Sequence, residues 1–365
     1  MQIALLGPIL WDSQWGNAHE LTKVLCKENP VTFIEPVEPL NTDSAGLKRA
    51  VKNVIVKDLK IVPRRSQLPI GTRYVLYSEL RHWIDIMKEN YDILVTYHTL
   101  TGFFAVLYSR LKKKRVLLVY ADDLAELFGN TSKIAWFVTK FFFTPLVARM
   151  SDAVVVTAER LKADIERYNR NVTLIPNGVN LKEFRVMDVA RSGFCVGFVG
   201  GFGPWVDFSI ILRAAEELHE IEFLLVGGGK QLTQIKERAK VLQNIRVTGP
   251  KPHNEIPALI NTMDVCLIPF AVDRVTNRVS PVKLFEYWAL KKPVISTPIY
   301  ELKRIAGDRI LYMNNSKELI DRIKKLQYNK ELRLKMGEEG YKAVKNYDWA
   351  ELGKRYVEII EKLVK

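Results

Sequence analysis

The sequence predicts an α/β protein with two Rossmann-like domains. Short apolar runs alternate along the chain with segments of helical periodicity, which is the pattern of parallel βαβ units. Several of these runs end in glycine-rich or polar loops, where open parallel sheets bind their ligands. The chain has 365 residues, which is enough for two domains of ordinary size.

The first half of the chain predicts one such domain. Strands are expected at 3–6, 31–34, 93–96, 116–120, 153–157 and 172–175. Helices are expected at 19–27, 78–89, from 102, at 134–150 and at 158–168. Residues 36–70 carry only short strand-like pieces. The half ends at Asn177-Gly178, a dipeptide that favours positive φ and a sharp turn.

The second half repeats the pattern. Strands are expected at 194–199, 223–226, 245–248, 265–269 and 294–297, with helices from 208, at 256–261 and from 281. Residues 347–365 predict one amphipathic helix at the end of the chain.

Composition narrows the class of protein. Cys26, Cys195 and Cys266 are far apart in apolar runs, so we expect neither a zinc site nor a disulfide framework. The protein is therefore expected in a reducing compartment. The first residues, MQIALLGPIL, have no basic leader and predict a strand rather than a signal peptide.

The net charge of +14 permits nucleic acid, an anionic membrane or a phosphate-bearing substrate as partner. No nucleic-acid-binding motif accompanies the charge, so we expect no nucleic acid. The basic clusters at 48–65 and 110–115 indicate either a generally basic surface or a face that docks on acidic lipid. The apolar stretch 134–150 contains Lys140 and Pro145, which makes it a poor membrane span. A helix packed on the sheet is expected there, and a monotopic membrane contact is the alternative.

The stretch 280–297, SPVKLFEYWALKKPVIST, has the clearest chemical signal. Ser280 is expected to cap a helix, with Pro281 at its first position. Lys283 and Glu286 are three residues apart and so share a face, and the apolar residues of the same helix are expected to form its buried side. Free N–H groups at a helix start, with Lys283, would bind phosphate, and Glu286 could accept hydrogen bonds from a ribose diol. The alternative is an ordinary capped helix with an ion pair.

Other candidates follow the predicted strands. Gly200 and Gly201 open a glycine-rich loop whose N–H groups could hold a diphosphate, although the loop is not a P-loop motif. His98 and Asp122 each follow a strand in the first half and could accept a proton from a sugar hydroxyl. Asp123 could instead cap the next helix.

The stretch 280–297, the IPNGVN turn and the GPWVDF loop resemble the two-Rossmann-domain (GT-B) glycosyltransferases of family 4, or group 1, including relatives from teichuronic acid biosynthesis. The resemblance implies two domains facing across a cleft, with the last helix crossing back to the first domain. The acceptor-side domain would be 1–178 with 347–365, and the nucleotide-sugar domain 179–346.

The resemblance also implies roles for single residues. In the family, the glutamate matching Glu286 holds the donor ribose, and an acid or histidine at the position of Asp122 faces the reacting centre. Gly16, Asn17 and His19 would line the acceptor side. Many members carry a glutamate where this chain has Arg278, which leaves the sugar and the anomeric outcome open.

The expected function is transfer of a sugar, of hexosyl type and with retention, from a nucleotide-diphosphate sugar to a hydroxyl of a glycan or lipid-linked acceptor. Without a DxD motif we expect no metal, and no cofactor besides the donor. The alternatives are a non-catalytic sugar-nucleotide-binding protein and an epimerase or phosphorylase on the same fold. A cytoplasmic protein of cell-envelope polysaccharide biosynthesis is implied, with a peripheral contact to the inner face of the membrane.

Overall fold

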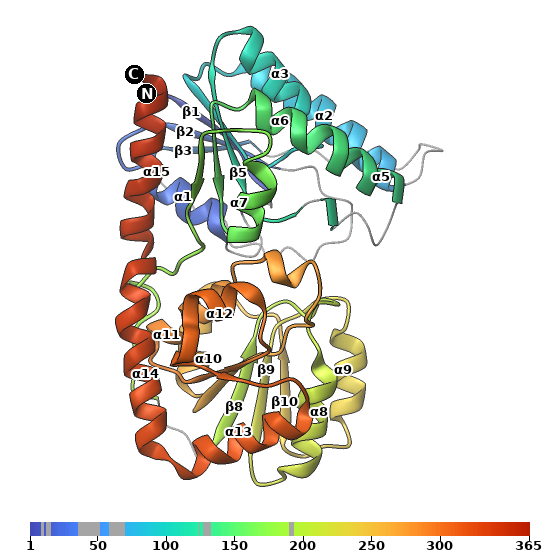
Figure 1. The fold of residues 1–365 in the computed structure, drawn as a ribbon, viewed down its shortest axis with the longest axis vertical. Helices are drawn as coiled ribbons and strands as arrows, with labels where there is room; N and C mark the ends of the chain where they lie inside the picture. Colours follow the sequence, from blue (N-terminus) through green and yellow to red (C-terminus); the bar gives the residue numbers. More distant parts are fainter. Residues whose placement is uncertain are drawn as a thin grey trace. The chain divides into compact units, whose positions relative to one another are not determined.

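The chain forms two compact units in a computed structural model, drawn as a ribbon in Figure 1. The model describes residues 1–8, 11, 16–35, 52–57, 70–123, 125–126, 133–189 and 193–365, and for 70–78 the backbone only. The first unit holds residues 1–176 and 349–365, and the second holds 177–348. The last helix of the chain therefore belongs to the first unit.

The sheet of the first unit is parallel, with strand order β3-β2-β1-β4-β5-β6-β7. Its strands are β1 (Ile3–Leu6), β2 (Val31–Ile34), β3 (Val54–Lys57), β4 (Ile93–Thr96), β5 (Arg115–Tyr120), β6 (Ala153–Val156) and β7 (Val172–Leu174). Alternate residues of β1 enter different cores: Ile3 and Leu5 pack on one face, and Ala4 and Leu6 on the other. Both faces are therefore covered, as in other parallel sheets.

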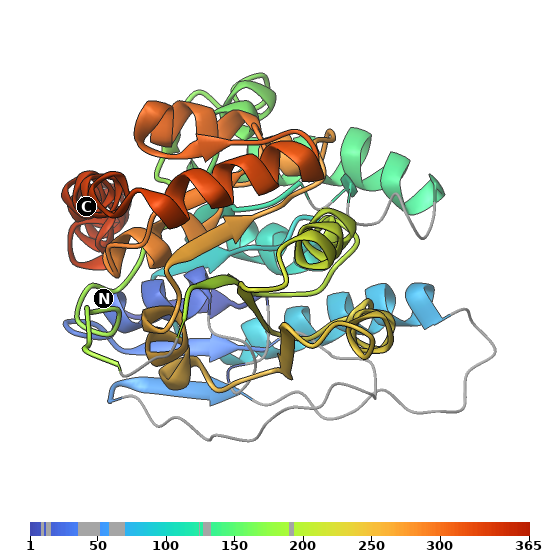
Figure 2. The same cartoon turned by 90° about the horizontal axis from the view of Figure 1, so that it is seen from below.

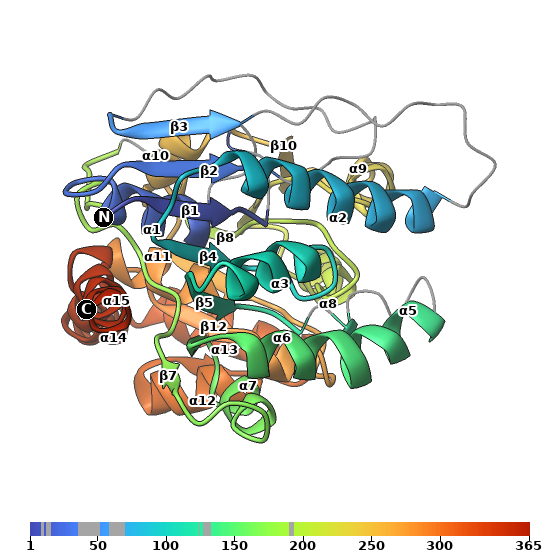
Figure 3. The ribbon, with the colours of Figure 1, turned by 90° about the horizontal axis from the view of Figure 1, so that it is seen from above.

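Helices cover the two faces of this sheet. They are α1 (Asn17–Leu25), α2 (Ile70–Lys88), α3 (Phe103–Leu111), α5 (Lys133–Val138), η1 (Thr139–Phe143), α6 (Thr144–Met150), α7 (Glu159–Ile165) and α15 (Trp349–Val364). Helix α15 packs on α1, whereas α3 lies beside both α2 and α6 (Figure 3). Helix α2 begins at residue 70, earlier than the expected start at 78.

The predicted helix at 134–150 is interrupted by a π-helical turn. Residues Thr139–Phe143 form this turn, and Pro145 follows as the second residue of α6. A proline has no N–H to donate within a helix, and its ring clashes with the carbonyl four residues earlier. A wider π-helical turn before the proline avoids this clash. None of the described helices is long and apolar enough to cross a bilayer.

The sheet of the second unit is also parallel, with strand order β10-β9-β8-β11-β12-β13. Its strands are β8 (Cys195–Val199), β9 (Glu222–Val226), β10 (Ile245–Gly249), β11 (Val265–Ile268), β12 (Val294–Ser296) and β13 (Leu311–Tyr312). Its α-helices are α8 (Phe208–Glu217), α9 (Leu232–Ala239), α10 (Ile256–Asn261), α11 (Val282–Ala289), α12 (Tyr300–Ala306), α13 (Ser316–Tyr328) and α14 (Lys330–Val344). Figure 2 shows helices on both faces of this sheet.

Each sheet has one point where the strand order reverses. In the first unit it lies between β1 and β4, and in the second between β8 and β11. Ligands of open α/β sheets bind beyond the carboxyl ends of the two strands that flank such a point. A candidate residue is therefore best placed to bind a ligand if it lies at one of these two reversal points.

Candidate functional site

The reversal point of the second sheet brings Gly200 and Lys283 together. Gly200 follows β8 directly and has φ of +144°, and its N–H donates to Val226 O at 2.9 Å. A Cβ atom on Gly200 would lie 2.2 Å from Lys283 Cε and 2.5 Å from its Nζ. Only glycine therefore allows the Lys283 ammonium group to lie against this loop.

The loop after β9 holds the first glycine loop in place. A Cβ atom on Gly227 would lie 1.9 Å from Gly200 O, so this approach also requires glycine. The N–H of Phe202 donates to Gly228 O at 2.6 Å. The two strand ends thus form one rigid backbone surface, in which the N–H groups of Gly200 and Phe202 are used and that of Gly201 donates to no acceptor among the described residues.

Aromatic rings position the Lys283 ammonium. Its Nζ lies 5.5 Å from the ring centroid of Phe198 and 5.4 Å from that of Phe270. Burial lowers the pKa of Lys283, and the Glu286 carboxylate opposes this shift. Within the part of the chain that is described, Lys283 forms no ion pair within 4.0 Å. Its charge is therefore available to a bound anion.

The start of α11 differs from the prediction. The helix begins at Val282, Pro281 occupies the cap position, and no side chain caps the first turn. The expectation that Ser280 caps this helix was therefore wrong. Its Oγ accepts a hydrogen bond from Asn177 N–H at 3.2 Å, and Asn177 Nδ2 donates to Ser280 O at 2.7 Å. Because no hydroxyl caps the helix, its first N–H groups stay open to a ligand.

The buried face of α11 fixes the direction of its polar face. Leu284, Phe285 and Trp288 are fully buried, as the amphipathic pattern predicted. The hydroxyl of Tyr287 accepts a hydrogen bond from Val199 N–H at 3.0 Å, which ties the helix to the end of β8. Lys283 and Glu286, by contrast, are partly exposed.

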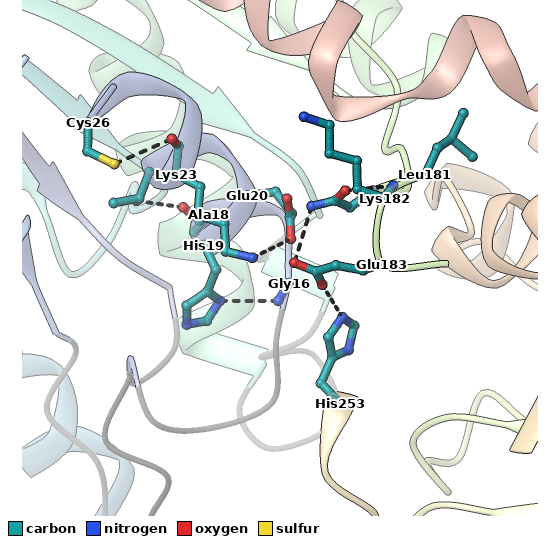
Figure 4. A network of polar contacts seen from close by, with 12 residues as sticks. Gly16, Ala18, His19, Glu20, Lys23, Cys26, Leu181, Lys182, Glu183 and His253 are labelled. Carbon is teal, nitrogen blue, oxygen red and sulfur yellow. Dashed lines mark hydrogen bonds and ion pairs between the residues drawn. The ribbon is translucent and has the colours of Figure 1, made fainter. Parts of the chain in front are cut away.

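Glu286 makes no ion pair within 4.0 Å in the described ranges. Burial raises the pKa of its carboxyl group, while His253 and Lys283 lower it. His253 follows β10, and its Nε2 lies 3.6 Å from Glu183 Oε2 (Figure 4). The Glu286 oxygens are therefore free to accept hydrogen bonds from hydroxyl groups.

The reversal point of the first sheet is closed by His98. Its Nε2–H donates to Gly7 O at 2.8 Å, since a carbonyl can only accept, and its Nδ1 accepts from the Thr101 hydroxyl at 2.8 Å. Burial and the neighbouring His82 lower the pKa of His98 to about 3. The His98 ring is therefore neutral, and both of its nitrogens form hydrogen bonds, of which the one to Gly7 joins the loops after β1 and β4. It has no free lone pair for proton transfer.

Asp122 and Asp123 have different surroundings at the end of β5. Asp123 is buried, accepts a hydrogen bond from Tyr120 OH at 3.2 Å and lies 3.7 Å from Lys140 Nζ. Asp122 is exposed and has no partner among the described residues. Desolvation by the surrounding protein and the negative charge of Asp123 both raise the pKa of the Asp122 carboxyl group. Asp122 is thus the carboxylate that a ligand could reach.

Gly16, Asn17 and His19 organise the start of α1. The N–H of Gly16 donates to His19 Nδ1 at 3.1 Å (Figure 4). The His19 ring is fully buried and packs against Trp11 with 5.2 Å between centroids. Asn17 Oδ1 accepts a hydrogen bond from Tyr97 OH at 2.6 Å. Of these three residues, Gly16 and Asn17 are partly exposed and His19 is fully buried.

Sequence reasoning did not single out Trp205. Its side chain lies over Gly203 and is exposed beside Gly201, and its place in the GPWVDF loop was the available signal. Arg274 is exposed, and Arg278 Nη1 donates to its carbonyl at 3.0 Å. No group of His, Cys, Asp or Glu side chains suited to a metal ion occurs among the described residues.

Solved structures define the class. Sucrose-phosphate synthase from Thermosynechococcus elongatus is similar over 99% of this chain and 98% of its own, with a TM-score of 0.77 and 16% identity. Anabaena Alr3699/HepE, solved in complex with UDP-glucose, is similar over 100% of both chains, with a TM-score of 0.70 and 14% identity. The fold is therefore that of the GT-B glycosyltransferases.

Sequence comparison gives the family. Residues 18–183 match the model described as Glycosyltransferase Family 4, and residues 193–329 match the model described as Glycosyl transferases group 1. The chain belongs to the group 1/family 4 glycosyltransferases.

Two relatives illustrate the range of the family. The putative teichuronic acid biosynthesis glycosyltransferase TuaH of Bacillus subtilis is 27% identical over 164 residues, which is 41% of each chain. The uncharacterized glycosyltransferase MJ1178 of Methanocaldococcus jannaschii is 25% identical over 332 residues, 88% of this chain and 89% of its own.

Proposed function

We propose that this nucleotide-sugar glycosyltransferase transfers a hexosyl group from a UDP-sugar to a hydroxyl of a glycan or lipid-linked acceptor. The observation that carries the proposal is the Lys283 ammonium held against Gly200 at the reversal point of the second sheet. The Anabaena HepE structure in complex with UDP-glucose supports a uridine donor.

The donor would bind through three groups of the second unit. Its diphosphate would lie on the N–H group of Gly201, since that of Gly200 is already bonded to Val226 O, and at the open start of α11, beside Lys283. Its ribose hydroxyls would donate to Glu286. Since the leaving group is a diphosphate, these positive groups would stabilise the charge that develops as the glycosidic bond breaks.

The acceptor would meet the first unit. Asp122 is the proposed partner of the reacting hydroxyl, because its carboxylate is exposed and unpaired at the end of β5. Retention of the anomeric configuration is carried over from the family resemblance. We propose that the protein cations take the role of a metal and that no cofactor besides the donor is needed.

Turnover of labelled UDP-sugars with glycan and lipid-linked acceptors tests the proposal. Asp122→Asn should lower transfer at least ~100-fold, as expected for loss of a proton acceptor, and leave donor affinity unchanged. The NMR spectrum of the product reports the anomeric outcome. A protein that binds UDP-sugars but never transfers them, with or without the substitution, would instead be a sugar-nucleotide-binding protein.

A further inference from the structure

Aromatic rings of the first unit form a chain of contacts across three helical segments, α2, α3 and η1. Trp83 of α2 contacts Phe104 of α3, with ring centroids 5.9 Å apart. Phe104 contacts Phe103 at 5.4 Å, and Phe103 contacts Phe143 of η1 at 5.3 Å. Phe143 contacts Phe142 at 6.2 Å. We refer to these residues, with Ile134, Phe137 and Phe141, as the aromatic strip.

Much of the aromatic strip is exposed. The exposed fractions are 77% for Ile134, 59% for Phe137, 55% for Phe141 and 66% for Phe142. Phe137 and Phe141 also contact each other, with centroids 4.9 Å apart. Scattered apolar residues are normal on a surface, but a contiguous group of this kind marks an interaction site.

The π-helical turn contributes to this exposure. Residues Thr139–Phe143 form the turn, and both Phe141 and Phe142 within it are exposed. Because a π turn contains more residues than an α turn, successive side chains are rotated less, and neighbours can face the same side. Helix α6 buries Val147 and Ala148 in the core, so only the part of the stretch before it faces outward.

Two of the segments that carry the aromatic strip are basic. Residues 103–115 contain five Lys or Arg and no Asp or Glu. Residues 133–150 contain three Lys or Arg and likewise no Asp or Glu. Arg110 and Arg115 both pair with Asp152, whereas Lys112, Lys113 and Lys133 are exposed with no ion pair among the described residues. These two segments are therefore positive, as is the whole chain, whereas α2, which carries Trp83, also holds Glu79 and Asp85.

We propose that the aromatic strip docks on the surface of an anionic lipid bilayer. Phe137, Phe141 and Phe142 would enter the boundary between headgroups and acyl chains, while Lys112 and Lys113 contact lipid phosphates. A second copy of this chain fits less well, since each copy carries a net charge of +14 and would bring the same positive segments. This inference does not depend on the transfer chemistry.

Vesicle co-sedimentation of the full chain tests the apolar part. Binding to vesicles containing phosphatidylglycerol should exceed binding to phosphatidylcholine alone at least ~10-fold and should weaken as salt rises. The double variant Phe141→Ser/Phe142→Ser should bind at least ~10-fold more weakly. The matched control is Val241→Ser/Tyr328→Ser in the second unit, where both residues are also strongly exposed. It should bind as the unchanged protein does.

A second pair tests the charge. Lys112→Gln/Lys113→Gln should lose roughly fivefold per residue, the factor that corresponds to about 1 kcal/mol for each basic group near the lipid. Lys324→Gln/Lys325→Gln, exposed on α13, changes the net charge equally and should have little effect. Circular dichroism confirms that each variant is folded.

Two results would overturn the proposal. One is no binding to phosphatidylglycerol vesicles at low salt, and the other is binding that the phenylalanine pair does not change. If sedimentation velocity instead shows a dimer that Phe141→Ser/Phe142→Ser dissociates, without lipid binding, then the aromatic strip is an interface between copies of this chain.

Discussion

At the scale of single residues, the candidate donor site depends on two contacts between distant parts of the chain. Lys283 lies against Gly200, and Tyr287 bonds to the backbone of Val199. Each contact joins α11 to the end of β8. The helix can therefore present Lys283 and Glu286 together only while the glycine loop keeps its shape.

Replacing Gly200 should damage donor binding directly. In Gly200→Ala, the new Cβ atom would displace the end of Lys283, and the φ of +144° is one that L-residues rarely adopt. We expect UDP affinity to fall at least ~10-fold in a calorimetric titration. Gly307→Ala is the control, because its φ is also positive but nothing lies within 4 Å of its Cβ position. Equal affinities in the two variants would contradict the role of the Gly200 contact.

Glu286→Ala should also weaken the binding of UDP. Hydrogen bonds to a charged group contribute about 1.5–3 kcal/mol, which corresponds to a loss of roughly 10–100-fold in UDP affinity. Glu216→Ala, an exposed glutamate on α8, should have no effect. If deoxyuridine diphosphate, which lacks the 2′ hydroxyl, loses more affinity from Glu286→Ala than UDP does, the ribose assignment is wrong.

At the scale of elements, the start of α3 is capped from α2. The Glu79 carboxylate accepts hydrogen bonds from Phe103 N–H at 2.8 Å and Phe104 N–H at 3.1 Å. Burial nevertheless raises the pKa of this carboxyl group to about 7, because desolvation outweighs the two N–H groups. The contact holds together two helices that carry the aromatic strip, and no local sequence pattern indicates it, because Glu79 and Phe103 are 24 residues apart.

This carboxyl group makes stability depend on pH. The folded pKa exceeds the unfolded value, so the folded state binds more protons between about pH 4.5 and 7, and stability falls as pH rises through this range. In Glu79→Gln that dependence should disappear. The unfolding free energy of the unchanged protein relative to the variant should drop by roughly 2–3 kcal/mol from pH 4 to pH 8. Urea titrations at several pH values measure it, and a constant difference would refute the assignment.

Helices and strands could be predicted where the pattern of apolar residues within the segment was sufficient. The apolar runs predicted most strands, and amphipathic spacing predicted which face of α11 is buried. The cap of α11 was not predictable, because the Ser280 hydroxyl bonds to Asn177, a residue far away in the sequence. The stretch 134–150 was predicted to be a helix packed on the sheet. That is correct for α6, but the periodicity alone did not reveal the π turn or the exposure of Phe141 and Phe142.

At the scale of the whole molecule, two open sheets each offer one reversal point, and the two points differ. In the second unit, this place holds glycine loops, a partly exposed lysine and an uncapped helix start. In the first unit, His98 closes it by bonding to Gly7. His98 and His19 were sequence candidates because of their residue type and position. Their burial could be learned only from the packing of several strands around them.

The basic segment 48–65, one of the two clusters that indicated membrane docking, lies outside the described residues except at 52–57. The lipid contact proposed here therefore combines the other cluster, 110–115, with the aromatic strip. Donor binding and lipid binding belong to different units and can be tested independently.

The central claim is that a nucleotide diphosphate binds at the start of α11 beside Lys283. Calorimetric titration with UDP of the unchanged protein, Lys283→Gln and the exposed control Lys303→Gln tests it most directly. The account predicts binding to the unchanged protein and to Lys303→Gln, with affinity at least ~10-fold lower for Lys283→Gln. Equal affinity for all three proteins would contradict it.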